Sequence, residues 1–209
     1  MTHIDRRVMD DALTYDAYLA LIHQLLSQNK TTGTDQSPTM IQYTELNQVR
    51  MARLDKTTKL SEALTSKLAQ FTRKEIWLVL TEGWCGDAAQ VIPVLAKIAD
   101  NSPYIDLRLI LRDEHLDIMD AFLTDGARSI PKLLVLDAET LEVLRTWGPR
   151  PSAPQQMVLE AKAKMREMSD HAEQKAFFDA VKTEVQKWYA RDKTRGIQEE
   201  IGEFVSTND

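Results

Sequence analysis

The chain has 209 residues, of which 43% are hydrophobic and 28% charged, and its formal net charge is −6. Such a composition is ordinary for a globular protein, and the length allows one core with helical additions. The acidic balance argues against general binding to nucleic acid or to an acidic membrane surface, because neither would meet a basic field. No apolar run approaches the roughly 18 residues that span a bilayer.

The single cysteine and the start of the chain indicate where the protein resides. The first residues lack the apolar core of a secretory signal peptide. One cysteine permits no internal disulfide, which is typical of proteins from reducing compartments. We therefore expect a cytoplasmic protein.

The first 71 residues are predicted to form a helical extension. Residues 10–28 carry apolar side chains at spacings of three and four, which predicts an amphipathic packing helix. From residue 39 to 71 the pattern is again helical but interrupted, with Leu46 and Val49 in its first apolar stripe. We expect the first segment to pack through its apolar face, and a second stripe of the later segment is formed by Leu60, Leu64 and Leu68.

A basic cluster lies between the stripes of the second segment. Its members recur at a spacing of three and therefore share one helix face: Arg50, Arg53, Lys56 and Lys59. A solvated face is the simpler interpretation. The functional alternative is a docking site for an anionic ligand or partner, in which Asn47, Arg50 and Arg53 are the residues of interest.

The next hundred residues alternate between strand and helix patterns. A buried strand over 76–81 precedes a helix over 84–100 that contains Pro93, and a second strand over 104–111 is its natural parallel partner. A short helix, a hairpin and a further helix follow, which gives the order βαβαββα. The predicted ranges of those later elements are 114–123, 132–137, 141–147 and 154–168.

A last helix is predicted over residues 171–192, packed on the core or on a second copy of the chain, and the tail beyond Ile201 is predicted to be loosely held. We therefore expect three parts. They are a helical extension over 1–71, an α/β domain over 72–170, and a C-terminal helix with its tail over 171–209.

The cysteine occupies a chemically informative place in this pattern. It stands in Glu82-Gly83-Trp84-Cys85-Gly86-Asp87-Ala88-Ala89, where the first buried strand turns into a helix. Such a position aims the unpaired amides of the helix start at the side chain. Those amides stabilise a thiolate, which is the reactive form of cysteine.

The motif Trp84-Cys85-Gly86-Asp87-Ala88 resembles the Trp-Cys-Gly-Pro-Cys of the thioredoxin family. Pro93 is similar to the proline that kinks the family's active-site helix, and Ile130-Pro131 resembles its cis-proline loop, which faces the cysteine. The resemblance covers residues 72 to about 150–170. It implies a thioredoxin-like fold in which Trp84 shields the sulfur, Gly86 allows close approach, and the backbone of Ile130 pairs with an extended substrate that Pro131 presents.

Three departures from the family's motif bear on activity. Ala88 stands where the family has its second, resolving cysteine, Val79 where it has a buried acid, and Asp87 where it has the motif's proline. The dithiol cycle therefore cannot run within one chain. The Asp87 carboxylate should make Cys85 less acidic than its counterpart in a thioredoxin, although still partly ionised near neutral pH.

These features leave three functions open. The first is monothiol thiol–disulfide exchange at Cys85 with a protein or low-molecular-weight thiol or disulfide, in which an outside thiol resolves the mixed disulfide. The second is a non-catalytic module that binds peptides or proteins. The third, an iron–sulfur cluster carrier, would need glutathione-binding residues that the sequence does not show. We expect no cofactor and no metal, since no phosphate loop, dinucleotide fingerprint or metal-ligand spacing is present. A homodimer is possible.

Three further residues could contribute to the site. Arg128 precedes the Ile130-Pro131 loop and could contact an anionic group beside the sulfur. Arg150 follows the predicted hairpin and is a plausible surface contact for a partner, and Gly148 resembles a glycine that the family keeps near its active site. The acidic run at Asp113 could supply an acid or a base, but a helix N-terminal turn explains it more simply.

Overall fold

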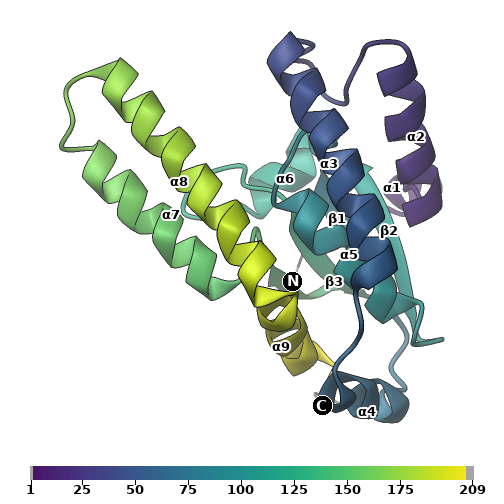
Figure 1. The fold of residues 1–209 in the computed structure, drawn as a ribbon. Helices are drawn as coiled ribbons and strands as arrows, with labels where there is room; N and C mark the ends of the chain where they lie inside the picture. Colours follow the sequence, from purple (N-terminus) through teal and green to yellow (C-terminus); the bar gives the residue numbers. More distant parts are fainter. Residues whose placement is uncertain (1, 206–209) are drawn as a thin grey trace.

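A four-stranded mixed sheet forms the centre of the protein (Figure 1). The computed structural model describes residues 2–205. The strands are arranged in the order β2-β1-β3-β4, with β2 parallel to β1 and both β3–β1 and β4–β3 antiparallel. Their bounds are β1 Glu75–Thr81, β2 Ile105–Leu111, β3 Lys132–Asp137 and β4 Val143–Trp147. The predicted strands, including the hairpin, are all present.

The core is densest around β1 and the helix that follows it. Residues 77–80 of β1 are fully buried, as expected for a central strand covered on both faces. Helix α5 (Ala88–Ala99) is buried along nearly its whole length and contains Pro93. This strand-to-helix junction is therefore a rigid support for the cysteine motif that lies between the two elements.

The N-terminal extension consists of four helices where the sequence pattern predicted two segments. They are α1 Arg6–Asp11, α2 Tyr15–Ser27, α3 Pro38–Thr57 and α4 Glu62–Gln70. The extension is also tied to the sheet, because Leu13 forms a bridge with Leu109 of edge strand β2 and His3 forms one with Glu142 beside β4.

Helix α3 packs on α5 through a face that the sequence analysis did not identify. The buried residues of α3 are Ile41, Thr44, Asn47, Met51 and Leu54. Leu46 and Val49, the first apolar stripe of the predicted helix, do not pack in the core, since these side chains are 46% and 67% exposed. Apolar side chains are thus left on the outer surface of α3.

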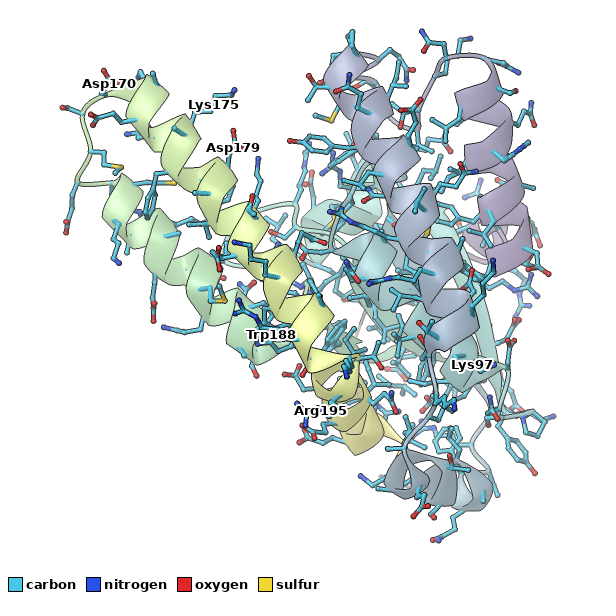
Figure 2. All side chains as sticks on the ribbon, in the orientation of Figure 1. Lys97, Asp170, Lys175, Asp179, Trp188 and Arg195 are labelled. Carbon is cyan, nitrogen blue, oxygen red and sulfur yellow. The ribbon has the colours of Figure 1, made fainter. Side chains whose placement is uncertain are left out.

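The C-terminal half adds a projecting helical hairpin. A 3-10 turn at Arg112–Glu114 and α6 (Leu116–Ala121) connect β2 to β3, and α7 (Ser152–Met165) and α8 (His171–Asp192) pack side by side. The far end of this hairpin, with Asp170, Lys175 and Asp179, lies away from the sheet, whereas Trp188 lies near the body (Figures 1 and 2).

The chain ends in a helix that the sequence analysis missed, α9 (Arg195–Phe204). Ile197 and Ile201 are fully buried, and Val205 is 3% exposed. The predicted loose tail beyond Ile201 is therefore wrong up to Val205, and the rest of it lies outside the described residues. None of the helices within residues 2–205 is both long and apolar enough to cross a membrane.

Candidate functional site

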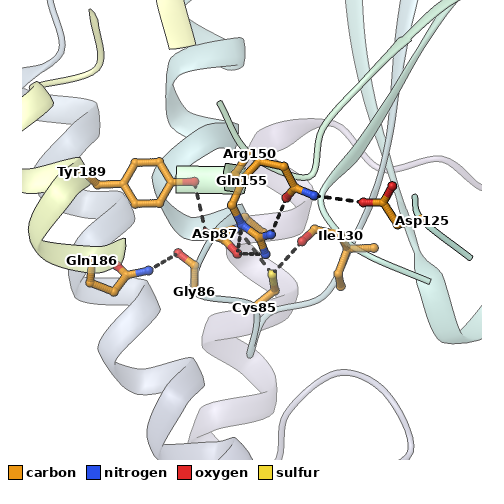
Figure 3. A network of polar contacts seen from close by, with 10 residues as sticks. Cys85, Gly86, Asp87, Asp125, Ile130, Arg150, Gln155, Gln186 and Tyr189 are labelled. Atoms are coloured by element: carbon orange, nitrogen blue, oxygen red, sulfur yellow. Dashed lines mark hydrogen bonds and ion pairs between the residues drawn. The ribbon is translucent and has the colours of Figure 1, made fainter. Parts of the chain in front are cut away.

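Cys85 lies in the turn between β1 and α5, as predicted, and its thiol is held from two sides (Figure 3). The Ala88 N–H donates to Sγ at 3.5 Å, and the thiol donates to the carbonyl oxygen of Ile130 at 3.3 Å. The Ile130–Pro131 bond is cis. Ile130 is 5% exposed and its carbonyl accepts from the thiol, and the expected pairing of its backbone with an extended peptide stays a prediction.

Burial determines the ionisation of this thiol. Desolvation, with a smaller contribution from the Asp87 carboxylate, raises the pKa of Cys85 to about 12. The backbone N–H groups of Ala88 and Asp87 and the Arg150 guanidinium act in the opposite direction but do not outweigh burial. The expected partial ionisation near neutral pH is therefore wrong for this conformation, in which the thiol is protonated.

Asp87 forms a partly buried ion pair that the sequence did not reveal. Its Oδ2 accepts from Arg150 Nη2 at 2.6 Å and from Nε at 3.0 Å, and both side chains are about 14% exposed. Arg150 Nη1 also donates to Gln155, which donates in turn to Asp125. The Arg150 guanidinium is thus a structural partner of the cysteine motif (Figure 3), and its expected contact with a binding partner stays a prediction.

Helix α8 closes over the motif through two side chains that the sequence analysis missed. The Tyr189 hydroxyl donates to Asp87 Oδ1 at 3.1 Å, and Gln186 Nε2 donates to the Gly86 carbonyl at 3.4 Å. Burial raises the pKa of Tyr189, so its hydroxyl stays protonated and available as a donor. In the sequence, Tyr189 follows Val185 by four residues, which places the two side chains on one face of a helix. The structure shows that both are buried.

Helix α3 holds the other side of the motif. Asn47 Nδ2 donates to the Gly83 carbonyl at 2.9 Å, and Arg50 Nη1 donates to Asn47 Oδ1 at 2.9 Å. The Gly83 N–H donates to Thr32 Oγ1 at 2.8 Å. Of the residues of interest on α3, Asn47 and Arg50 thus lie at the motif, although Asn47 acts as a buried structural contact.

A groove of about 470 Å³ runs between α3 and α8, with the cysteine motif at its base. Trp84, Cys85 and Gly86 line it there. Its walls are mainly apolar and come from α3 and from the α7–α8 hairpin: Met40, Tyr43, Leu46, Val158, Phe178, Val181 and Val185. Leu46 therefore faces this groove, which explains why the apolar stripe of α3 is not buried in the core.

Some charged side chains at the groove have an ion-pair partner among residues 2–205, and one does not. Asp87 is paired with Arg150, and Lys182 with Asp179 at 2.9 Å. Arg50 is half-buried at the groove wall, and within residues 2–205 it forms a hydrogen bond with Asn47 but no ion pair. Within residues 2–205, the groove is thus an apolar channel beside which Arg50 has no ion pair, although the nearby Asp87 carboxylate attracts its charge.

The remaining predicted contacts lie elsewhere. Arg128 pairs with Asp120 at 2.6 Å on the surface, so its charge is already matched. Arg53 lines a different cleft, on the far side of Tyr189. Gly148 has a φ of +111°, and a Cβ there would lie 2.4 Å from the Pro131 carbonyl oxygen, so glycine is required for this close approach to the proline loop.

The acidic run after β2 supports the tryptophan of the motif. Asp113 pairs with Arg112 at 2.7 Å, and the Arg112 guanidinium lies over the Trp84 ring at 4.9 Å. The Asp113 N–H donates to Glu82, whose pKa is raised by burial. Within residues 2–205, no group of three or more His, Cys, Asp and Glu side chains could hold a metal ion.

The raised pKa of Cys85 makes a prediction for alkaline stability. A group whose pKa is raised on folding stabilises the native state below its unfolded pKa, and this stabilisation is lost as the pH rises toward the folded pKa. With an unfolded pKa of about 8.5 and a folded pKa of about 12, ionisation of the unfolded chain should cost the wild type about 2 kcal/mol at pH 10. Urea unfolding at pH 8 and pH 10 should show that loss in the wild type relative to Cys85→Ala. Equal pH dependence in both proteins would contradict it.

Comparison with known proteins identifies the family. No curated protein matches the chain. An HIV epitope scaffold shares 22% identity over 68% of this chain and 81% of its own, with a TM-score of 0.47. A protein of unknown function from Pseudomonas aeruginosa shares 21% identity over 83% of this chain and 96% of its own, also at 0.47. A family model described as thioredoxin matches residues 33–167, which is more than half of the chain and includes α3 and the cysteine motif. The chain therefore belongs to the thioredoxin family.

Proposed function

We propose that this thioredoxin-family protein is a binding module, whose groove between α3 and α8 holds an apolar segment of a partner protein. The observation that supports this most directly is the contrast between the groove and the thiol beside it. The groove is open and apolar, with a volume of about 470 Å³, whereas burial keeps Cys85 protonated. Volumes of this size suit a few apolar side chains of a bound segment.

The charge at the groove defines the segment further. Arg50 has no ion pair among the described residues 2–205, and burial lowers its pKa because the charged form is partly desolvated. An acidic group on the bound segment would compensate this charge in a setting of reduced dielectric. We therefore expect an apolar segment that carries an aspartate, a glutamate or a terminal carboxylate.

A fluorescent probe with the same chemistry tests the groove. We expect 1-anilinonaphthalene-8-sulfonate, an aromatic dye with one anionic group, to bind saturably to the folded protein. Leu46→Asp removes an apolar contact and repels the sulfonate, so it should weaken dye binding about tenfold, equivalent to about 1.4 kcal/mol. Dye fluorescence titrations of the folded variants measure this effect.

The matched control is Leu123→Asp, because Leu123 is similarly exposed, at 40% against 46% for Leu46, and does not line the groove. Equal weakening in both variants would contradict the assignment. Peptides selected from a random phage-displayed library on the wild type should be apolar and acidic, and they should bind Leu46→Asp poorly.

The second candidate function is monothiol thiol–disulfide exchange at Cys85. It is favoured by the position of the thiol at the groove, where a bound segment would meet it, and by the Ala88 N–H that donates to Sγ. With alanine at position 88, a mixed disulfide would persist until an outside thiol attacked it. This function requires a conformation in which the thiol can ionise, and the reactivity measurement described in the Discussion distinguishes it from the first.

A further inference from the structure

A second cleft, separate from the cysteine groove, is lined by residues from the C-terminal end of α3 and from the junction of α8 and α9. Its volume is about 390 Å³, at the small end of the range for small-molecule sites. The lining residues are Arg53, Leu54, Thr57, Thr58, Lys59, Tyr189, Ala190, Lys193 and Thr194. None of them is acidic, although the protein carries six more acidic than basic side chains.

Three cations gather at this cleft without compensation. Arg53, Lys59 and Lys193 are exposed, and within residues 2–205 none of their side chains forms an ion pair or a hydrogen bond. They come from segments about 135 residues apart in the sequence, so helix periodicity alone does not bring them together. Like charges around one cavity repel each other, and a bound anion would remove that cost.

A buried hydroxyl at the same cleft also lacks a partner. Thr58 is 7% exposed, and its Oγ1 has no hydrogen-bond partner in the described part of the chain. The other two threonines are satisfied, because Thr57 donates to the Arg53 carbonyl and Thr194 accepts from Gln198. Because this oxygen has almost no accessible surface, a ligand would be held by the three cations and not by the hydroxyl.

The helix ends at the cleft do not reverse this charge balance. The α3 C-terminus contributes about half a negative charge from its free carbonyls, which is small against three full positive charges. The N-terminus of α9 begins directly after Thr194 and adds about half a positive charge. Tyr189 and Leu54 provide apolar contacts for the organic part of a bound ligand.

We propose that this cleft binds a small molecule that carries a phosphate or diphosphate group. The phosphate oxygens would accept from the Arg53 guanidinium and from the ammonium groups of Lys59 and Lys193, since such oxygens accept several charge-assisted hydrogen bonds at once. Tyr189 links the cleft to the cysteine motif, because this residue lines the cleft and its hydroxyl donates to Asp87. Ligand binding would thus hold α8 against the motif.

Calorimetric titration with inorganic pyrophosphate at constant ionic strength tests the site. We expect saturable binding to the wild type and at least tenfold weaker binding to the Lys59→Gln/Lys193→Gln double variant. Both lysines are exposed, so this variant should fold like the wild type, which its melting temperature without ligand checks. The matched control is Lys30→Gln/Lys74→Gln, which removes the same charge from exposed positions outside the cleft and should bind like the wild type.

Two results would overturn the proposal. One is a binding heat that does not saturate as pyrophosphate is added to the wild type. The other is an equal loss of pyrophosphate affinity in both double variants, which would show a general charge effect. The outcome is independent of the groove, because Leu46→Asp leaves every residue of this cleft unchanged and should bind pyrophosphate normally.

Discussion

Cys85 in the folded protein is expected to react with iodoacetamide at pH 7.5 about 3,000 times more slowly than an exposed thiol with a pKa of about 8.5. The reason is the thiolate fraction. At that pH an exposed thiol is about one-tenth ionised, whereas a thiol with a pKa of about 12 is ionised to only a few parts in 100,000. The rate should rise about tenfold for each pH unit between 7 and 10, without a plateau.

Protonation and limited access can be separated in the same experiment. Limited access lowers the rate at every pH but leaves the midpoint unchanged, whereas a raised pKa moves the midpoint. The urea-unfolded protein supplies the exposed reference thiol, and Cys85→Ala supplies the blank. A plateau below pH 9 in the folded protein would contradict the expected pKa and would favour monothiol exchange over the binding module.

Asp87→Asn should shift the pH profile of the alkylation rate toward lower pH, because the Asp87 charge raises the pKa of the thiol.

The sheet and the position of the cysteine could be predicted from the sequence because both depend on local patterns. A run of buried residues followed by helical spacing places Cys85 at the end of β1 and the start of α5. The hairpin and the parallel pairing of β1 with β2 follow from strand patterns and short connections. These features do not depend on which distant segment packs against them.

What could not be predicted concerns distant contacts. Leu46 and Val49 have the spacing of a packing face, but spacing does not tell whether that face meets the core or a groove. Likewise, nothing local indicates that Arg150 pairs with Asp87 or that Tyr189 reaches the same carboxylate. The thiol's pKa was mispredicted for this reason, since its burial depends on these distant contacts.

The pairing of Arg150 with Asp87 leads to the largest stability effect that we expect. Arg150→Ala should lower the free energy of unfolding by about 3–5 kcal/mol, because it leaves the Asp87 carboxylate buried without its counter-ion. Urea unfolding at pH 7 measures this change.

The matched control is Arg128→Ala, which breaks an ion pair of the same 2.6 Å length on the surface. Its two side chains are about half exposed, so its loss should cost no more than about 1 kcal/mol. The Asp87→Asn/Arg150→Gln double variant should recover part of the stability lost in Arg150→Ala, since a neutral amide needs no counter-ion. If Arg150→Ala proved as mild as Arg128→Ala, the ion pair would not hold the motif. The Asp87 charge would then be solvated, and the shielding of Cys85 by α8 would have to depend on Gln186 and Tyr189 alone.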